Sequence, residues 1–355
     1  MRPGNTDNPL AGDLDHVLEH TERLWEELRG GRLFITGGVG FVGRWLLESF
    51  VWAQDELALN ASAVVLTRDV AAAARKAPGL ADHPAVQFQE GDMRTFAFPD
   101  GAFSHVVHAA TQTGVSQDAP DPLAKFDSDL GGTRRVLELA RSRHARRFLF
   151  TSSGAVYGRQ PPELTHLPED YSGAPDPLDP NSAYAQGKRA SEFACAAYCR
   201  LYGLEAVVAR GFAFVGPHLP LDAGYAIGNF VRDAERGGPI SVHGDGTPYR
   251  SYLYAADLAI WLWTLLIRGR PCRSYNVGSD DDMTIAELAH VVARVLAPDA
   301  GVQIHTPRHA AQPAERYVPS IDRARAELGL RPIVPLDDAL RRTSAWLARS
   351  RGMAT

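Results

Sequence analysis

The chain has 355 residues, 45% of them hydrophobic and 22% charged, and is therefore long enough to bury the core of one large domain or two modest ones. A net charge of -5 leaves no basic surplus, which excludes nucleic acid as a partner. The longest apolar stretch, residues 255–267, is too short to span a bilayer, and residues 1–15 show no basic-then-apolar export signal, so we expect no membrane partner and a cytoplasmic location.

Residues 13–29 carry apolar side chains at helical spacing among acidic ones, which predicts an amphipathic helix ahead of the first strand. Beyond it, short runs of strand-forming residues alternate with helical segments, and this strict alternation predicts an α/β fold with a doubly wound parallel sheet. From about Gly211 the pattern changes to loops rich in Pro and Gly with helices between them, which indicates a smaller, irregular C-terminal region. The expected strands are Leu33–Thr36, Ala63–Leu66, Val86–Phe88, His105–His108, Phe148–Thr151 and Ala206–Ala209.

The first expected strand runs directly into the glycine-rich turn from Gly37 to Gly43 and then into a helix. Glycines at such a junction permit a tight turn and let the backbone approach a pyrophosphate at the helix N-terminus. The strand-turn-helix context therefore predicts a dinucleotide site on a Rossmann-like fold. We accordingly expect a helical extension over residues 1–31, a dinucleotide-binding domain over 32–209, and a mostly substrate-binding region over 210–355 that is interleaved with it.

The residues after the second strand bear on the choice between NAD and NADP. NAD enzymes usually place an acid there for the adenosine ribose 2′-hydroxyl, whereas this chain has Thr67 followed by Arg68, which suits a 2′-phosphate. We therefore favour NADP, while Asp69 keeps NAD open because expected strand ends shift by a residue or two. Asp92, after the third strand, is suitably placed to contact adenine, although Gly-Asp is also an ordinary turn.

Lys188, one of only three lysines, follows Tyr184 by four residues at the start of an expected helix. One helical turn puts the phenol and the ammonium on the same face, where the cation favours the phenolate and can bond a nicotinamide ribose. Cys195 and Cys199, further along this helix, have no third or fourth ligand residue nearby. We therefore interpret them as buried apolar side chains and expect no metal site.

The buried strand that precedes this helix ends in the hydroxyl-rich run Thr151-Ser152-Ser153. At the carboxyl end of a parallel strand, a serine hydroxyl can hydrogen-bond a substrate oxygen while a tyrosine transfers its proton. Such residues are often only caps or turns. Following the glycine turn and preceding the Tyr184/Lys188 pair, in this order and spacing, the run favours a catalytic role.

These motifs closely resemble those of the nucleotide-sugar epimerase/dehydratase family, the extended short-chain dehydrogenases/reductases. The resemblance runs from about Arg32 to Leu330. The matching motifs are Thr36 to Gly43, Gly91-Asp92, His108-Ala109-Ala110, Thr151 to Gly158, Tyr184/Lys188, Arg210 to Pro217, Gly244-Asp245-Gly246 with Arg250, and Tyr275-Asn276-Val277-Gly278.

The resemblance implies a set of site residues. Ser153 is then the catalytic hydroxyl, Tyr184 the acid/base and Lys188 its ribose-binding partner. The implied contacts of an NAD(P) cofactor are Gly37, Gly40, Phe41, Val42, Gly43, Arg68, Asp92, Met93, Ala109, Ala110, Tyr184 and Lys188. The implied contacts of a nucleotide-diphosphate sugar are Thr111, Ser153, Arg250 and Arg316. A guanidinium suits the diphosphate, although a surface ion pair remains the alternative for either arginine. The family also implies a homodimer built through a helix bundle.

Departures from the family pattern narrow the reaction. Family dehydratases place acids directly after the catalytic hydroxyl, where this chain has Gly154-Ala155, so we disfavour 4,6-dehydration and acid-assisted decarboxylation. Hydride transfer at one carbon remains, which we expect at C4, by a 4-epimerase or by a 4-ketosugar reductase. Asp129 and Ala213 stand where the family has asparagines, and the second change leaves an atypical substrate or pose open.

Two alternatives stay open at this point. One is a dehydratase that recruits its acid from elsewhere, for example Asp129 or Glu163, and releases a 4-keto-6-deoxy sugar. A non-catalytic dinucleotide-binding sensor on the same fold would be expected to lack the Ser153, Tyr184 and Lys188 set, which this chain retains.

Overall fold

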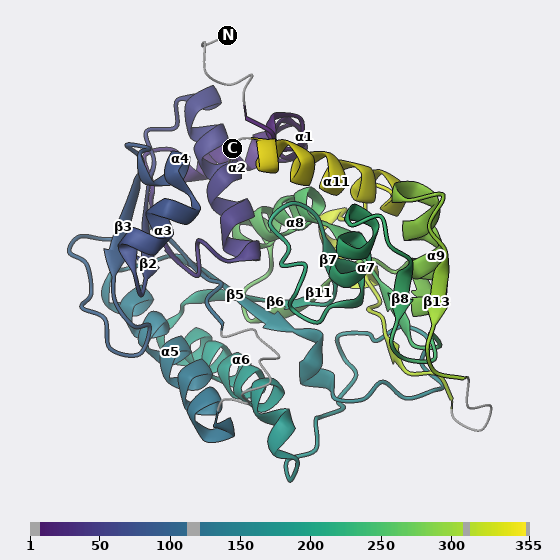
Figure 1. Ribbon diagram of the computed structural model, residues 1–355. Helices are drawn as coiled ribbons and strands as arrows, with labels where there is room; N and C mark the ends of the chain where they lie inside the picture. Colours follow the sequence, from purple (N-terminus) through teal and green to yellow (C-terminus); the bar gives the residue numbers. More distant parts are fainter. Residues whose placement is uncertain (1–7, 112–120, 308–312, 353–355) are drawn as a thin grey trace.

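The computed structural model describes residues 8–111, 121–307 and 313–352 (Figure 1), so the first seven residues of the predicted extension lie outside it. At its centre is a seven-stranded sheet in the order β11-β6-β5-β4-β1-β2-β3, in which every pair is parallel. The strands are β1 (Arg32–Thr36), β2 (Ser62–Thr67), β3 (Val86–Glu90), β4 (His105–His108), β5 (Arg147–Ser153), β6 (Glu205–Gly211) and β11 (Arg273–Val277). The predicted Rossmann-like fold class is confirmed, and the strand order reverses between β1 and β4, where such sheets bind ligands.

All six strands expected from the sequence belong to this sheet, whereas the seventh, β11, was not expected. The segment Arg273–Val277 pairs in register with β6, from Arg273 opposite Val207 to Val277 opposite Gly211. Its first residues are polar and partly exposed, so the run gives neither a clear alternation nor a long apolar stretch. The region after residue 210 therefore contributes an edge strand to the dinucleotide-binding sheet.

Helices cover both faces of the sheet (Figure 1). One face packs against α5 and α6, and the other against α2 and α8 with α1 outside them. The helices are α1 (Ala11–Trp25), α2 (Phe41–Leu57), α3 (Val70–Lys76), α4 (Pro78–Ala81), α5 (Pro122–Ser142), α6 (Ala183–Tyr202), α7 (Ala226–Glu235), α8 (Ala255–Arg268), α9 (Ile285–Leu296), α10 (Asp322–Leu328) and α11 (Leu336–Gly352), with short 3-10 turns η1 (Glu26–Leu28), η2 (Gly154–Tyr157) and η3 (Pro180–Ser182).

Helix α8 is apolar on all sides because it is enclosed on all sides. Residues from Ala255 to Ile267 are buried between the sheet, α2 and α1. Burial in the protein core therefore explains why the longest apolar stretch of the sequence lies here, and no membrane is needed to explain it. Among the residues that the structure describes, none of the helices combines the length and the hydropathy needed to cross a bilayer.

The predicted N-terminal helix is present as α1 followed by η1, and it packs on this chain's own domain. Trp25 contacts Trp263 of α8 with ring centroids 4.9 Å apart. The hydroxyl of Tyr254 donates to the carboxylate of Asp13 at 2.6 Å. These contacts bury the apolar face of α1 within the protomer.

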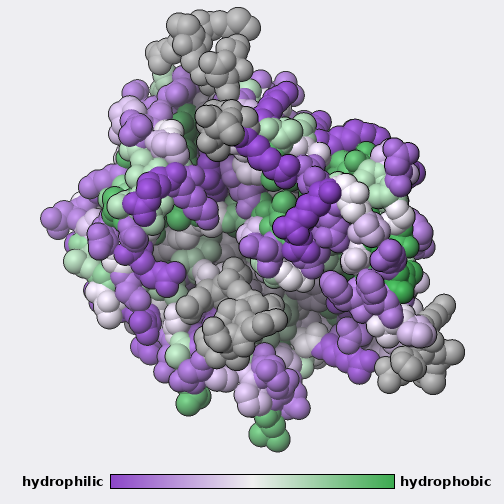
Figure 2. All heavy atoms as spheres, viewed as in Figure 1, coloured by the Kyte–Doolittle hydropathy of each residue, from purple (hydrophilic) through white to green (hydrophobic). Residues whose placement is uncertain are grey.

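Three small sheets lie beyond the carboxyl edge of the main sheet and shape the second region. Their strands are β7 (Phe214–Val215), β8 (Ile240–Val242), β9 (Tyr249–Ser251), β10 (Leu253–Tyr254), β12 (Asp282–Thr284), β13 (Val302–Ile304) and β14 (Arg316–Tyr317), paired as β10-β7, β12-β9-β14 and β13-β8. Polar side chains cover most of the face seen in Figure 2, and apolar ones form small separate groups on it.

Candidate active site

The glycine turn is folded so tightly that side chains would not fit at its key positions. Gly37 has a φ of +73°, and a Cβ there would lie 2.6 Å from the backbone nitrogen of Ala110. A Cβ on Gly43 would lie 2.2 Å from the carbonyl oxygen of Gly37. Gly40 precedes the first residue of α2, and no side chain caps that helix. The first turn of α2 thus fits a pyrophosphate, which would accept hydrogen bonds from its amides.

A buried hydrogen-bonded row holds the neighbouring loop against this turn. His108 lies between the hydroxyls of Thr36, at 2.7 Å, and Thr133, at 3.1 Å. The Thr36 hydroxyl in turn accepts from the backbone nitrogen of Ala110 at 3.1 Å. Burial lowers the pKa of His108 to about 3, so the ring is neutral and serves as a fixed bridge. Ala109 and Ala110, which the resemblance implies as cofactor contacts, are thereby kept beside Gly37.

The end of β2 separates the roles of the two charged residues that follow it. β2 ends at Thr67, and the carboxylate of Asp69 accepts from the backbone nitrogen of Ala72 at 2.8 Å, which caps α3. Arg68 is exposed and close enough to lower the pKa of Asp92 electrostatically. That carboxylate also accepts from Arg94 at 2.9 Å. Asp69 is therefore engaged in the helix cap, while Arg68 is exposed beside it.

Met93, in the loop after β3, is the next cofactor contact that the resemblance implies. Its side chain packs closely over Gly132 of α5, where a Cβ would lie 2.7 Å from the Met93 Cγ. This contact fixes the loop after β3 against α5, beside Asp92.

Ser153, Tyr184 and Lys188 come together where β5 meets the start of α6. The Lys188 side chain is 2% exposed, and its ammonium donates to the carbonyl oxygen of Thr151 at 2.7 Å. Its nitrogen lies 5.9 Å from the ring centroid of Tyr184, and Tyr184 shares a hydrogen bond with Ser153. The structure thus brings together the phenol, the ammonium and the strand-end hydroxyl that the sequence singled out.

Burial controls the protonation of both titrating groups. It raises the pKa of Tyr184, while the hydrogen bond with Ser153 acts in the opposite direction. It lowers the pKa of Lys188 to about 8, and the negative charge of Asp129 opposes this shift. At neutral pH the phenol holds its proton and Lys188 is largely charged, a state from which the pair can donate a proton to a sugar oxygen.

A second buried lysine lies beside this group, and the sequence reasoning missed its role. Lys125 and Asp129, one turn apart on α5, form an ion pair whose side chains are 8% and 3% exposed. The Lys125 nitrogen lies 4.8 Å from the ring centroid of Tyr184, and Asp129 packs against Gly187, where a Cβ would lie 3.0 Å from the Asp129 Cβ. The sequence did contain a signal for this pair, since Lys125 is one of only three lysines and precedes by four residues Asp129, which stands where the family has an asparagine.

Arg210 and Asn276, two residues of the matching motifs, belong to a hydrogen-bonded network next to Ser153. Ser152 donates to the carboxylate of Glu192 at 2.6 Å, and that carboxylate pairs with Arg210 at 2.7 Å. Arg210 also donates to the hydroxyl of Tyr157, which donates to the side-chain oxygen of Asn276 at 2.6 Å. Arg210 and Asn276 therefore tie β5, β6 and β11 together under the catalytic strand.

The predicted substrate residues fall into two groups. Tyr317 of β14 pairs in register with Arg250 of β9, and Arg316 pairs with Tyr249. Because neighbouring residues of a strand point to opposite faces, Arg250 and Tyr317 share one face and Arg316 lies on the other. Arg316 bonds Asp282 at 2.6 Å and stacks 3.9 Å above the Tyr249 ring. The ion-pair alternative thus describes Arg316 in this structure, while Arg250 makes a long contact of 4.0 Å with Glu315 and shares the face of Tyr317.

The remaining predicted positions are the substrate contact Thr111 and the two acids considered for elimination, Asp129 and Glu163. The hydroxyl of Thr111 is buried and has no hydrogen-bond partner among the described residues. Glu163 is exposed in the loop after η2. Of the two acids considered for a relocated elimination step, only Asp129 lies beside the catalytic group, and it is already paired with Lys125.

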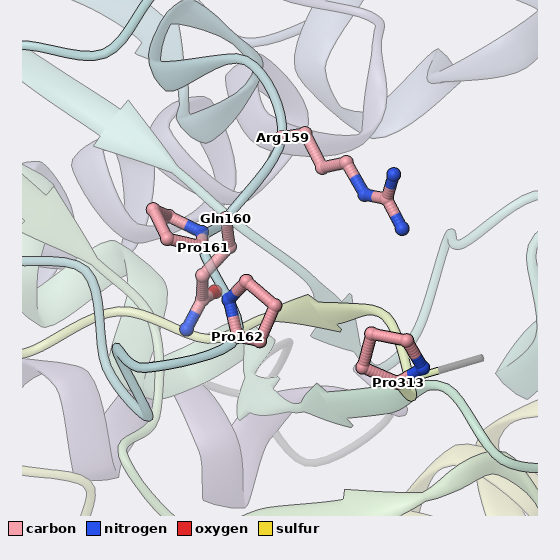
Figure 3. A pocket seen from close by; sticks show the side chains of 5 residues that line it. All are labelled: Arg159, Gln160, Pro161, Pro162 and Pro313. Carbon is pink, nitrogen blue, oxygen red and sulfur yellow. The ribbon is translucent and has the colours of Figure 1, made fainter. Parts of the chain in front are cut away.

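A pocket of about 490 Å³ opens between the loop after η2 and the segment that leads into β14. It is lined by Arg159, Gln160, Pro161, Pro162 and Pro313. The exposed side chain of Arg159 extends away from Pro161 and Pro162, on the side of Pro313 (Figure 3). The pocket therefore adjoins both the loop that follows Ser153 and the strand that carries Tyr317.

Comparison with known proteins agrees with this geometry. Residues 33–278 match the model of the NAD dependent epimerase/dehydratase family. The chain belongs to this family. It is 30% identical to UDP-glucuronic acid decarboxylase 1 of Arabidopsis thaliana, over 88% of this chain and 68% of that protein. It is 28% identical to UDP-glucuronic acid decarboxylase 1 of Danio rerio, over 90% of this chain and 73% of that protein.

Among solved structures, the chain resembles the dTDP-glucose 4,6-dehydratase DesIV of Streptomyces venezuelae, determined with NAD and TYD bound. The identity is 26% and the TM-score 0.74, with 91% of this chain and 98% of that chain covered. The family identified from the sequence motifs is therefore confirmed, as is an enzyme of the nucleotide-sugar class.

Proposed function

We propose that this enzyme transfers hydride at C4 of a nucleotide-diphosphate sugar, as a 4-epimerase or a 4-ketosugar reductase. The proposal rests on one observation: Ser153, Tyr184 and Lys188 converge at the carboxyl end of β5, on the side of the sheet where the glycine turn opens. A bound nicotinamide would accept or supply the hydride there. The chain's own residues then have to bind the sugar and move a single proton.

The proposed division of work follows from the charges. Tyr184 exchanges its proton with the sugar oxygen, and Ser153 holds that oxygen by a hydrogen bond. Lys188 remains cationic near neutral pH and stabilises the phenolate after the proton has left. Asp129 supports that role, because its charge raises the pKa of Lys188.

The absence of acids after Ser153 supports a reaction confined to C4. Gly154 and Ala155 carry no group that can protonate a leaving hydroxyl or remove a proton from C5. The packing supports the same conclusion, since a Cβ on Gly154 would lie 2.7 Å from the hydroxyl oxygen of Tyr317 and 2.7 Å from the Phe212 ring. An acidic side chain at residue 154 would have no room.

We further propose that the preferred cofactor is NADP. Asp69, the acid nearest the ribose position, is engaged as the cap of α3. Arg68 is exposed beside it, and a guanidinium forms strong charge-assisted bonds to a phosphate. For the substrate diphosphate we propose Arg250 and Thr111. Arg316 would have to leave Asp282 before it could take part.

Decarboxylation is a second candidate, supported by the similarity to UDP-glucuronic acid decarboxylases. Oxidation at C4 of a hexuronic acid gives a ketone β to the carboxylate, which loses CO2 without an acid directly after Ser153. Chromatography with mass detection separates the candidates: a new peak of unchanged mass indicates epimerisation, addition of two hydrogens reduction, loss of CO2 decarboxylation, and loss of water dehydration.

We also propose that the enzyme is a homodimer that pairs through α5 and α6. The support is a group of exposed apolar side chains on these helices: Leu123 is 73% exposed, Phe193 75% and Leu201 68%. Large apolar side chains concentrated on one pair of helices are typical of an interface between subunits.

Replacing Tyr184 by Phe tests the central assignment. General acid/base catalysis is worth about 10²–10⁴-fold in rate, so we expect hydride transfer to fall by at least about 100-fold with cofactor affinity unchanged. Turnover is followed by chromatography of the product, and net hydride transfer by nicotinamide absorbance, with a panel of nucleoside-diphosphate hexoses and hexuronic acids. Tyr202→Phe, on the exposed side of the same helix, is the matched control and should keep full activity. An unimpaired Tyr184→Phe enzyme contradicts the assignment.

A wild-type protein that binds the dinucleotide but acts on no nucleotide sugar contradicts the proposed function as a whole. That outcome favours the sensor alternative, whatever the variants do.

A further inference from the structure

A second phenol reaches the catalytic serine from the opposite side of the site. The hydroxyl of Tyr317 lies 3.4 Å from the Ser153 Oγ and 3.4 Å from the carbonyl oxygen of Gly211. Tyr184 shares its own hydrogen bond with the same serine. Ser153 is therefore flanked by two tyrosine hydroxyls, of which the sequence motifs indicated only one.

Tyr317 is held firmly in this position. Its ring packs on Phe212 with centroids 4.6 Å apart. The next residue, Val318, donates its backbone nitrogen to Gln160 at 3.0 Å and accepts from the backbone nitrogen of Leu167 at 2.8 Å. β14 is thereby fastened to the loop that follows Ser153, so the distance between the two hydroxyls does not depend on a free loop.

The Tyr317 hydroxyl has hydrogen-bonding capacity to spare. Both of its contacts are at 3.4 Å, which is longer than the range of about 2.5–3.0 Å for ordinary O–H···O bonds. Burial raises the pKa of Tyr317 to about 12, so at neutral pH it is an uncharged donor. A sugar oxygen that approaches Ser153 can replace either weak contact by a shorter one.

The phenol also fills the space beside the catalytic serine. The position directly after Ser153 is Gly154, and the hydroxyl oxygen of Tyr317 lies 2.7 Å from where its Cβ would be. A neutral donor thus occupies the place next to Ser153 that an acidic side chain on residue 154 would need. On the same face, Arg250 lies 5.8 Å from the Tyr317 ring centroid and adds positive charge.

We propose that Tyr317 is a specificity-determining residue that donates a hydrogen bond to the sugar, at an oxygen on a carbon adjacent to the reacting one, and holds the ring against Ser153. The proposal rests on the proposed function, because it assumes a nucleotide sugar at Ser153. It deepens that function, since it names the group that orients the sugar where this chain has no acid.

Tyr317→Phe tests the proposal because it removes the hydroxyl and keeps the ring that packs on Phe212. The measurement is calorimetric binding of two ligands to the dinucleotide-loaded enzyme: a nucleoside-diphosphate hexose that the wild type accepts, and the bare nucleoside diphosphate. A neutral hydrogen bond is worth about 3–10-fold in affinity. We expect the hexose conjugate to bind about 3–10-fold more weakly to the variant, with the bare diphosphate unaffected.

Tyr275→Phe is the matched control. Its hydroxyl donates to Glu327 at 2.7 Å and is remote from Ser153, so the variant should lose stability without changing the ratio of the two affinities. A merely structural role for Tyr317 would change both affinities together. Equal affinities of wild type and Tyr317→Phe for the hexose conjugate overturn the proposal, even where Tyr184→Phe abolishes hydride transfer as expected.

Gly154→Ala is a second variant that approaches the same phenol from the other side. Its methyl group would press on the Tyr317 hydroxyl and the Phe212 ring. We expect a comparable selective loss of affinity for the hexose conjugate. A wild-type enzyme that binds the bare diphosphate but no hexose conjugate overturns both this inference and the proposed function.

Discussion

Replacing Asp129 by Asn should be one of the most destabilising single changes near the active site. The partner, Lys125, would keep a buried charge with no counterion. The two side chains are 8% and 3% exposed, so the range for buried pairs applies, and breaking such a pair costs about 3–5 kcal/mol. An exposed pair would cost about 1 kcal/mol at most. We therefore expect urea denaturation to show a loss of about 3–5 kcal/mol in the free energy of unfolding.

The double variant Lys125→Met/Asp129→Asn separates the lost pair from any local misfit. Replacing both partners of a buried pair by side chains of similar size is often nearly neutral, so the double variant should recover most of the stability. The pH dependence gives a second readout. Asp129 raises the pKa of Lys188, so in the single variant the alkaline loss of hydride transfer should begin below about pH 8. A single variant that loses under about 1 kcal/mol, or a double variant equally unstable, refutes this reasoning.

Three further predictions concern other parts of the molecule. Arg68→Ala should weaken NADP binding at least about 10-fold and leave NAD binding unchanged in fluorescence titrations, because a charge-assisted phosphate bond is worth about 1.5–3 kcal/mol; equal losses would remove the basis for preferring NADP. Burial lowers the pKa of His218 to about 3, so as pH falls below about 6.5 the unfolded chain binds a proton at this residue that the folded chain does not, and this one histidine should cost the wild type up to about 2 kcal/mol by about pH 5. His218→Asn suits the left-handed φ of +70° and should reduce this acid sensitivity in urea denaturation; an identical pH dependence would contradict it. Phe193→Glu on α6 should convert a dimer to a monomer in analytical ultracentrifugation, and an unchanged mass would exclude that helix face as the interface.

Much of the main sheet could be predicted because its signals are local. The first six strands are short runs of strand-forming residues, and helices are the next elements after β1, β2 and β4. The glycine turn is recognisable from seven consecutive residues. The Tyr184/Lys188 pair was also predictable, since helical geometry alone brings residues four apart together.

What the sequence could not provide were contacts between residues far apart along the chain. Tyr317 reaches Ser153 across 164 residues, and only the register of β14 on β9 shows which of Arg316 and Tyr317 faces the site. Neighbouring residues of a strand point to opposite faces, so a shift of register by one residue would exchange the directions of the two side chains. No sequence motif specifies the register of a two-residue strand. The resemblance implied Arg316 as a substrate contact, but it could not show the direction of that side chain, whose guanidinium bonds Asp282 in the structure.

The position of β11 in the main sheet and the bond between Tyr254 and Asp13 also bear on the order of folding during synthesis. Strand β6 leaves the ribosome with one edge open, and its neighbour β11 follows more than sixty residues later. Helix α1 is synthesised still longer before its partner, because the bond that Tyr254 donates to Asp13 joins residues 241 positions apart. Contacts this distant close slowly, and an open strand edge can pair with another chain in the meantime. The nascent enzyme therefore passes through a vulnerable stage that ends only when the segment up to Val277 has emerged.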